Sequence, residues 1–365
     1  MSTGDQDAVA AFLTQALSGT GQVETVTTHI SRLFLAGSRV FKLKRAVRFP
    51  YLDFSTPERR LAACEAEVVL NRRTAPALYL GARRITRGPD GGLAFDGTGS
   101  LVDAVVEMRR FPEADLFDTL ACEGRLGPDH IVDLAQVIAA FHAGAEIHRD
   151  KGGAAALTAL VDLNAVALRA TGLASTGAVA TLTARFRAVL ARHAPLLDAR
   201  RAAGKVRRCH GDLTLRNICL FEGKPTPFDC IEFSETIATT DILYDLAFVL
   251  MDLWHRSRFD LANLLLNRYL DGADETDGLG LLPVLMALRA VIRAHVTAAQ
   301  AADGTGAAAA ARTAEARAYL ALGEDLLTDR PAGLLAVGGF SGSGKSSVAA
   351  AAAPWIGAAP GARIL

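Results

Sequence analysis

The stretch His210-Gly211-Asp212-Leu213-Thr214-Leu215-Arg216-Asn217 constrains this chain more than any other, because it places an acid and an amide five residues apart, with Asp229 twelve residues further on. Phosphoryl transfer needs positioned phosphates, neutralised charge and an oriented acceptor hydroxyl. Asp212 would orient that hydroxyl and accept its proton. Asn217 and Asp229 would hold Mg²⁺, a hard cation that prefers oxygen ligands. The pattern therefore predicts a kinase.

Short apolar runs flank this motif and predict strands at residues 206–209, 218–221 and 227–231. Glu222-Gly223-Lys224-Pro225 is the predicted turn between the last two strands. The two predicted metal ligands would then bracket one hairpin. Glu232 follows shortly after, and the sequence leaves open whether it approaches the substrate or is an ordinary loop charge.

The segment from His210 to Leu253 contains H-G-D-L-T-L-R-N-I-C-L-F, F-D-C-I-E-F and T-D-I-L-Y-D-L-A-F, and it resembles the aminoglycoside phosphotransferase-like family. The resemblance implies an α+β, two-lobed protein-kinase-like fold. More narrowly, the chain is similar to bacterial proteins that join such a domain to a P-loop ATP-binding domain. Relatives usually carry H-G-D-L-H-L-R-N, whereas Thr214 replaces the second histidine here. By the same resemblance, Asp241 and Asp245 belong to a structural helix behind the catalytic loop, and direct metal contact is the less favoured alternative.

A kinase-like fold requires an upstream lysine that contacts the α- and β-phosphates. Residues 30–36 and 39–43 predict a hairpin around a short turn. Val40-Phe41-Lys42 resembles the end of the kinase V-A-I-K strand, so Lys42 is the predicted phosphate ligand. Lys44 lies on the same face of an extended strand, because side chains alternate, and it remains the alternative.

The lysine needs an acid from a helix to hold it. A helix is predicted to begin near Ser55-Thr56-Pro57-Glu58 and to run to about Arg73. Glu65 and Glu67 both lie on it, but residues two apart point about 200° apart, so only one can face the lysine. Glu67 is preferred because it resembles the family's acid before an apolar helical face, and Glu65 is the alternative.

The nucleotide base is expected where the two lobes join. The apolar strand 102–108 is the predicted connector, and backbone groups near Glu107, Met108 and Arg109 are predicted to contact the adenine. The region of Thr27 to Ser31, where kinases place a glycine-rich loop, lacks that glycine pattern.

A second nucleotide signature, Gly339-Phe340-Ser341-Gly342-Ser343-Gly344-Lys345-Ser346, matches the P-loop pattern G-x-x-x-x-G-K-S. Its glycines, Gly339, Gly342 and Gly344, would let backbone N–H groups surround phosphates. Lys345 would reach the outer phosphates and Ser346 would bind Mg²⁺. A strand at 334–337 and a helix from Ser346 are predicted around it. Because a P-loop domain needs several further strands, residues 333–365 are expected to be the front of a truncated domain that continues in a full-length parent.

Three regions are therefore predicted: a small lobe at 1–108, a mainly helical large lobe at 109–327, and a linker with an incomplete P-loop domain at 328–365. Lysine plus arginine and aspartate plus glutamate both number 39, so no global field favours nucleic acid or membrane. The apolar segment 279–302 contains Arg289 and Arg293, which favours a buried helix over a membrane span. No signal-peptide pattern precedes the first lobe, and a cytoplasmic protein is expected.

The leading hypothesis is a phosphotransferase that uses ATP and Mg²⁺ and acts on a hydroxyl of a small molecule. One alternative is a nucleotide-binding pseudokinase beside a working P-loop domain. A related alternative is a specificity module that serves a C-terminal P-loop kinase or ATPase. The identity of the acceptor depends on variable parts of the site rather than on these motifs.

Overall fold

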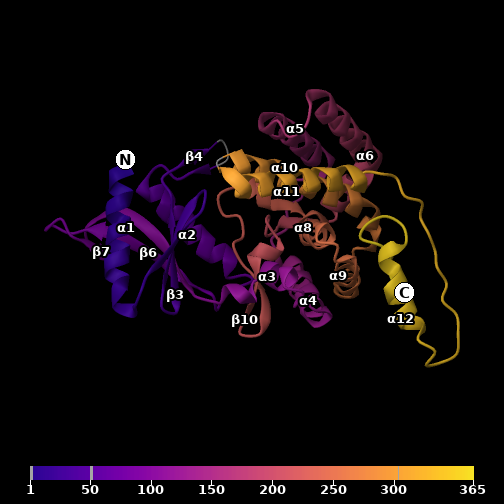
Figure 1. Ribbon diagram of the computed structural model, residues 1–365, viewed down its shortest axis with the longest axis horizontal. Coiled ribbons are helices and arrows are strands. Elements are labelled where there is room, and N and C mark those ends of the chain that lie inside the picture. The colour runs from indigo at the N-terminus through magenta and orange to yellow at the C-terminus, as the bar shows by residue number, and fades with distance from the viewer. Residues whose placement is uncertain (1–2, 50–51, 303) are drawn as a thin grey trace. The chain divides into compact units, whose positions relative to one another are not determined.

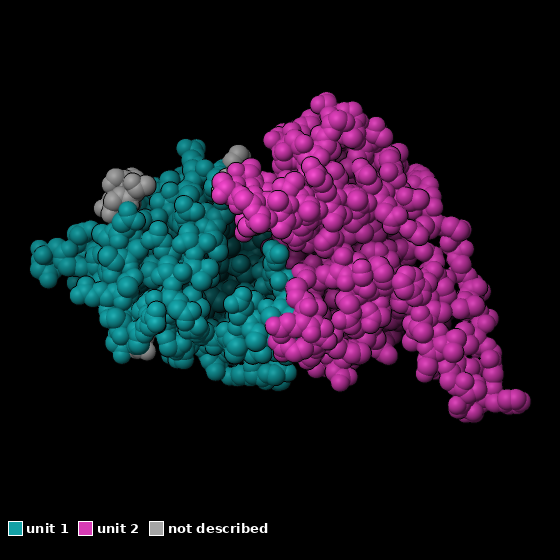
Figure 2. Space-filling view, in the orientation of Figure 1, with its two compact units in different colours: residues 1–120, 216–238 teal, residues 121–215, 239–365 magenta. Residues whose placement is uncertain are grey.

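The computed structural model describes residues 3–49, 52–302 and 304–365. The contacts group the chain into two compact units (Figures 1 and 2). Unit 1 comprises residues 1–120 and 216–238, and unit 2 comprises residues 121–215 and 239–365. Both units are thus discontinuous along the chain, whereas the predicted lobes follow one another in sequence.

The hairpin after the catalytic motif explains this grouping. Its Cys219 and Phe221 are buried in one apolar cluster with Leu78 and Met108, which belong to the first part of the chain. Residues 216–238 therefore join unit 1. As a result, Asn217 and Asp229 lie in the same unit as Lys42, and Asp212 lies in unit 2.

Unit 1 is built on a six-stranded antiparallel sheet with the strand order β1-β2-β3-β8-β6-β7. The elements of its first part are α1 (Thr3–Leu17), η1 (Ser18–Thr20), β1 (Glu24–Thr27), β2 (Ser31–Ala36), β3 (Arg39–Lys44), β4 (Arg48–Phe49), β5 (Leu52–Asp53), α2 (Pro57–Asn71), β6 (Tyr79–Arg87), β7 (Leu93–Phe95), β8 (Ser100–Arg109) and η2 (Glu113–Asp115). Those of its second part are β10 (Ile218–Phe221), β11 (Lys224–Pro227) and α7 (Glu235–Ala238). Two elements cross the boundary between the units, α3 (Phe117–Cys122) and η3 (Leu215–Asn217).

Apolar side chains on both faces of this sheet are buried against helices. On one face, Val9 of α1 joins Phe34 and Phe41 in a buried cluster. On the other, Val68 of α2 joins Val106 of β8. Because side chains alternate along β3, the residues on either side of Phe41 and Leu43 project toward the α2 face. This alternation places Lys42 and Lys44 beneath α2.

Helix α2 forms as predicted. Its N-cap is Thr56, whose hydroxyl accepts a hydrogen bond from the backbone N–H of Arg59, and Pro57 occupies the first turn. A buried ion pair fastens the helix to the sheet, since Arg60 Nε lies 2.7 Å from Asp103 Oδ1 on β8 and neither residue is exposed. The same guanidinium donates to the carbonyl of Phe54. These contacts fix the helix that carries Glu67.

Most of the strands predicted near the motif are confirmed, and one predicted strand is wrong. The β2–β3 hairpin and β10 lie where the sequence predicts them. The strand expected at 227–231 instead occupies Lys224–Pro227. Glu222 and Gly223 adopt positive φ angles of 53° and 75° and form a two-residue turn, so pairing resumes at Lys224. The chain then leaves the sheet before Asp229.

Unit 2 is mainly helical. Its elements are α4 (Pro128–Gly144), α5 (Gly153–Thr171), α6 (Thr176–Ala202), β9 (Val206–Arg208), β12 (Thr239–Asp241), α8 (Ile242–His255), α9 (Phe259–Gly272), η4 (Thr276–Leu281), α10 (Leu282–Ala302), α11 (Gly306–Leu326), α12 (Lys345–Ala352) and η5 (Ala353–Trp355). Helix α10 packs against α8, α11 and α5 (Figure 1). By length and apolar character, α5 and Thr276–Ala302 could each cross a membrane, but most of α10 is buried within the unit as a core helix.

The strand predicted at 334–337 is wrong. This segment is irregular, and Leu334 and Phe340 are 95% and 91% exposed. A lone strand leaves its backbone groups unpaired and buries too little apolar surface to be stable, and no partner strand pairs with it among residues 304–365. Further along, the amide of Asn263 on α9 donates to the carbonyls of Pro360 and Ala362, so the C-terminal segment packs on unit 2.

The Arg60–Asp103 pair provides a test of this architecture. We expect Asp103→Ala to lower the free energy of unfolding by about 3–5 kcal/mol, because it leaves a buried guanidinium without its charge partner. Urea denaturation followed by far-ultraviolet circular dichroism measures the change. As a matched control, Glu24→Ala removes a carboxylate from an exposed ion pair with Arg110 in the same unit and should cost at most about 1 kcal/mol. Equal losses in the two variants would contradict the role of the buried pair.

Candidate active site

Lys42 lies between two acids of unit 1. Its Nζ is 2.8 Å from Glu67 Oε1 and 2.5 Å from Asp229 Oδ1. Glu67 is fully buried, whereas Glu65 is exposed on the other side of α2. Of the two glutamates weighed from the sequence, Glu67 is therefore the one that reaches the strand lysine. The side chain of Asp229 is 41% exposed.

Lys44 also contacts Glu67. Its Nζ lies 2.5 Å from Glu67 Oε2 and 2.5 Å from Glu232 Oε1, and the residue is fully buried. The two oxygens of Glu67 thus hold different lysines. The structure brings both candidate lysines to one acid, and they differ in surroundings, since only Lys42 touches the partly exposed Asp229.

These contacts decide the charge states of the cluster. Burial by itself would lower the pKa of Lys42, but the carboxylates of Asp229 and Glu67 raise it well above its usual value. Burial likewise opposes the charge of Lys44, and Glu67 and Glu232 raise its pKa. Burial raises the pKa of Glu232, and the nearby Lys44 partly offsets this effect. Both lysines therefore carry their positive charges at neutral pH.

Side chains from two other elements fix the backbone around Asp229. The Asp229 N–H donates to the hydroxyl oxygen of Tyr79 at 3.2 Å, and the Cys230 N–H donates to Asn71 Oδ1 at 2.8 Å. Asp229 itself has a φ of 63°, in the left-handed region that is unfavourable for a residue with a Cβ. The surroundings hold this conformation and direct the carboxylate toward Lys42.

Asn217 lies beside this segment because of the β10–β11 hairpin. Its carbonyl accepts a hydrogen bond from the Phe228 N–H at 2.9 Å, directly after the last paired residues Ile218 and Pro227. The carboxamide of Asn217 and the carboxylate of Asp229 are oxygen donors at the open end of one hairpin. This donor set fits a hard divalent cation such as Mg²⁺.

The residues predicted to contact the base lie on β8, between β3 and β6. The Arg109 N–H already donates to the carbonyl of Leu78 at 2.9 Å, so that group is used within unit 1. The side chain of Glu107 pairs with Arg39 and Arg83. Met108 is buried near the end of β8.

In unit 2, a buried carboxylate organises the loop that carries Asp212. Asp245 Oδ1 accepts from the Gly211 N–H at 2.8 Å, and its Oδ2 accepts from the His210 N–H at 3.1 Å and lies 3.2 Å from His142 Nε2. Burial would raise the pKa of Asp245, but the hydrogen bond with His142 and the charges of His142, His210 and Arg289 lower it below its usual range. The predicted structural role of Asp245 matches this geometry.

Further contacts complete the loop. The Asp212 N–H donates to His210 Nδ1 at 3.3 Å, so the histidine braces the turn. Arg289 Nη1 of α10 donates to the Gly211 carbonyl at 3.1 Å, and Asp252 Oδ2 of α8 accepts from the Leu215 N–H at 2.9 Å. Asp212 is only partly buried. The loop is therefore fixed by its neighbours, while its acid is left accessible.

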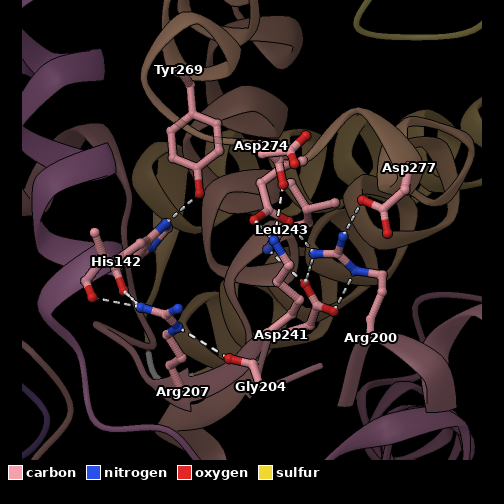
Figure 3. Close-up of polar contacts among 12 residues, drawn as sticks. His142, Arg200, Gly204, Arg207, Asp241, Leu243, Tyr269, Asp274 and Asp277 are labelled. Carbon is pink, nitrogen blue, oxygen red and sulfur yellow. Dashed lines mark hydrogen bonds and ion pairs between the residues drawn. The ribbon is translucent and has the colours of Figure 1, made fainter. Parts of the chain in front are cut away.

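Behind the loop, Asp241 caps α8 and pairs with Arg200 (Figure 3). The guanidinium of Arg200 contacts both oxygens of Asp241 at 2.8 and 2.9 Å and also reaches Glu275 and Asp277. Asp241 is opposite Val206 in the β12–β9 pair, and β9 leads into the catalytic loop. This buried cluster supports the strand from which the loop starts.

Several of these groups are not predicted by the sequence. Tyr79, Asn71 and Arg200 carry no local signal, because their partners are distant in sequence. Asp252 has one, since it is one of only two acids in a largely apolar helix. Arg289 stood out only as a charge that disfavours a membrane span.

The P-loop residues lie in the exposed C-terminal segment. Gly342 and Gly344 adopt positive φ angles of 75° and 81°, and α12 begins at Lys345. Lys345 Nζ donates to the carbonyls of Gly339 and Phe340 at 2.9 and 2.6 Å. Ser346 follows in the first turn of α12. The loop and helix are present without the strand that precedes them in a P-loop domain.

Comparisons with known proteins identify the family and the fold. The model of a family described as "Phosphotransferase enzyme family" matches residues 90–281. Uncharacterized proteins of Mycobacterium tuberculosis H37Rv and Mycobacterium bovis are 30% identical over 341 residues, which is 92% of this chain. The chain spans 66% of the length of these relatives.

Two solved structures resemble the fold. The aminoglycoside phosphotransferase APH(4)-Ia matches with a TM-score of 0.51 and 14% identity, over 87% of this chain and 99% of that one. A choline kinase from Cryptosporidium parvum Iowa II matches with a TM-score of 0.50 and 9% identity, over 88% and 96%. At these identities the likeness concerns the fold, which is kinase-like as predicted.

Asp245 makes the loop's stability depend on pH. Its pKa is lowered in the folded state, so its contribution is complete above the unfolded pKa of about 3.9 and is lost as the pH falls further. We expect Asp245→Asn to cost roughly 3 kcal/mol at pH 7, because an amide cannot accept from three donors as a carboxylate does. The gap between wild type and variant should narrow below about pH 4.

Urea denaturation at pH 7 and pH 3 measures this gap. Asp162→Asn is a matched control, because Asp162 is half exposed and pairs with Arg187 on the surface of the same unit. A gap that stays constant between the two pH values would show that the charge of Asp245 does not stabilise the loop.

Proposed function

This chain belongs to the phosphotransferase enzyme family, and from that premise we propose that it transfers the γ-phosphoryl group of ATP to a hydroxyl group of a small molecule, with Mg²⁺ as cofactor. The position of Lys42 carries the proposal, since its ammonium group is held between Glu67 and Asp229. A lysine oriented by a buried acid, next to an accessible carboxylate, is what the phosphates and metal of ATP require.

Each residue of unit 1 has a distinct role in the proposed reaction. Lys42 contacts the α- and β-phosphates, and Glu67 keeps its ammonium group in place. Asp229 and Asn217 would hold Mg²⁺, which would offset the negative charge of the phosphates when it is bound. The raised pKa of Lys42 supports this assignment, because the lysine stays protonated throughout the physiological range.

Asp212 is the proposed catalytic base. Its carboxylate orients the acceptor hydroxyl and takes its proton as the new O–P bond forms. At the same time the bond from the γ-phosphorus to the bridging oxygen breaks, and ADP leaves with that electron pair. Hydrogen bonds from His210 and Gly211 to Asp245 fix the loop so that little reorganisation is needed.

A pseudokinase that binds nucleotide without chemistry is the alternative. The complete set of base, metal ligands and phosphate lysine favours catalysis over this alternative. The acceptor of such an enzyme is selected by variable parts of the site, so antibiotic modification is not part of the proposal.

The reaction is tested by measuring ATP consumption against a panel of hydroxyl-bearing metabolites. We expect Asp212→Asn to reduce turnover by about 100-fold or more, since a positioned base contributes that much, while ATP still binds. Asp162→Asn serves again as the control and should leave turnover unchanged. Undiminished turnover in Asp212→Asn would refute the base assignment, and ATP binding without consumption across the panel would favour the pseudokinase.

A second nucleotide site is proposed at residues 339–346. The positive φ angles of Gly342 and Gly344 and the position of Lys345 support a phosphate-binding loop. The sheet that such a loop needs is not formed by the described residues after 303. The relatives exceed the matched span in length, and we propose that a complete P-loop domain accompanies the kinase-like part in proteins of this kind.

The two sites predict different responses in this chain. We expect Lys345→Ala to change the ATP affinity by less than about twofold, whereas Lys42→Ala should weaken it by at least about tenfold, the worth of one charge-assisted contact. Isothermal titration with ATP and Mg²⁺ distinguishes them. A larger loss in Lys345→Ala than in Lys42→Ala would move the main nucleotide site to the P-loop.

A further inference from the structure

A second buried ion pair lies next to the proposed phosphate lysine. The Nζ of Lys44 is 2.5 Å from Glu232 Oε1, and the two side chains are 1% and 5% exposed. The ring of Phe54 lies 5.1 Å from the same ammonium group. Because Lys44 is enclosed by two carboxylates and an aromatic ring, it is poorly placed to reach a phosphate.

Acidic and basic side chains alternate as ion-pair partners in this cluster. Lys42 and Lys44 are two residues apart on β3 and face the same side, while Asp229 and Glu232 are three residues apart after the hairpin. Each lysine pairs with one acid of the second segment. Glu67 joins the two lysines through its separate oxygens.

Binding of ATP in the proposed site changes the contacts of Lys42. Its ammonium group then interacts with the phosphates and less strongly with Asp229 and Glu67. Lys44 then remains as the cation beside Glu67, and its bond to Glu232 still ties the second segment to β3. The backbone bonds from Asp229 to Tyr79 and from Cys230 to Asn71 act on the same segment.

Stability alone does not account for this pair. A buried ion pair adds little net stability compared with apolar side chains of similar volume, because desolvating both charges is costly. What a charge pair does provide is a fixed geometry between two segments that are 188 residues apart in the chain.

We propose that Lys44 and Glu232 are positioning residues, which hold residues 229–232 against β3 so that Asp229 keeps its place as a metal ligand when Lys42 engages the nucleotide. This inference rests on the function proposed above. It assigns Lys44 a role separate from phosphate binding, and it assigns Glu232 a role in metal affinity without contact to the metal.

The experiment compares ATP binding in Mg²⁺ and in EDTA by isothermal titration. The ratio of the two affinities measures how well the metal is held. We expect this ratio to fall at least about tenfold in Lys44→Met and in Glu232→Gln, while binding in EDTA changes less than about threefold. Glu232→Gln is nearly isosteric and still accepts a hydrogen bond, so it reports on charge if Lys44→Met does not fold.

A double variant and a control sharpen the result. In Lys44→Met/Glu232→Met the affinity ratio should fall no further than in Lys44→Met alone, because both substitutions remove the same Lys44–Glu232 interaction. Arg59→Met, which removes an exposed cation paired with Asp53 in the same unit, should leave the ratio unchanged.

The outcomes separate the two proposals. If the wild-type protein binds ATP more tightly with Mg²⁺ and the variants keep that ratio, the positioning role is wrong and the proposed function stands. An equal loss in Mg²⁺ and EDTA, with a lowered melting temperature, also overturns the positioning role, because it is the signature of a purely structural pair. Absence of Mg²⁺-dependent ATP binding in the wild type would overturn the proposed function and this inference with it.

Discussion

The ion pairs of the Glu67 carboxylate with Lys42 and Lys44 are the interaction on which the rest of unit 1 depends. Glu67 is fully buried, and burying a carboxylate is costly unless cations pair with it. Lys42 and Lys44 supply that charge, and each stays charged in turn because of a second acid. Removing any one member would therefore leave the opposite charges of this cluster unbalanced. This mutual dependence holds α2, β3 and the segment after the β10–β11 hairpin in one arrangement.

Unit 2 also has a buried carboxylate, that of Asp245. His142, His210 and Arg289 lower its pKa, and its two oxygens accept hydrogen bonds from the N–H groups of Gly211 and His210. A buried charge is thus bonded directly to the backbone of the loop that carries Asp212. Asp212 is left partly exposed next to it. In both units, buried charges set the geometry, and accessible acids are the ones assigned to chemistry.

Local patterns made much of this structure predictable. The hairpin with Lys42 and the helix with Glu67 follow from alternation, an N-cap and a proline, which act over a few residues. The position of β11 could not be predicted in this way. The two-residue turn before it requires a positive φ at Glu222, which is unfavourable for a residue with a Cβ and which the sequence pattern does not reveal. The partners of Arg200 are 41 to 77 residues away, and no local rule connects them.

The comparison of two lysines shows why a motif alone does not define a site. Lys345 belongs to a complete P-loop pattern, yet it bonds carbonyls of its own exposed loop, and residues 334–337 form no strand to fix that loop. Ordering the loop around a phosphate would cost conformational entropy that reduces affinity. Lys42 matches a weaker pattern but is already oriented by buried acids. Preorganisation by the surrounding fold, rather than the quality of the motif, therefore favours unit 1 as the place where the nucleotide binds in this chain.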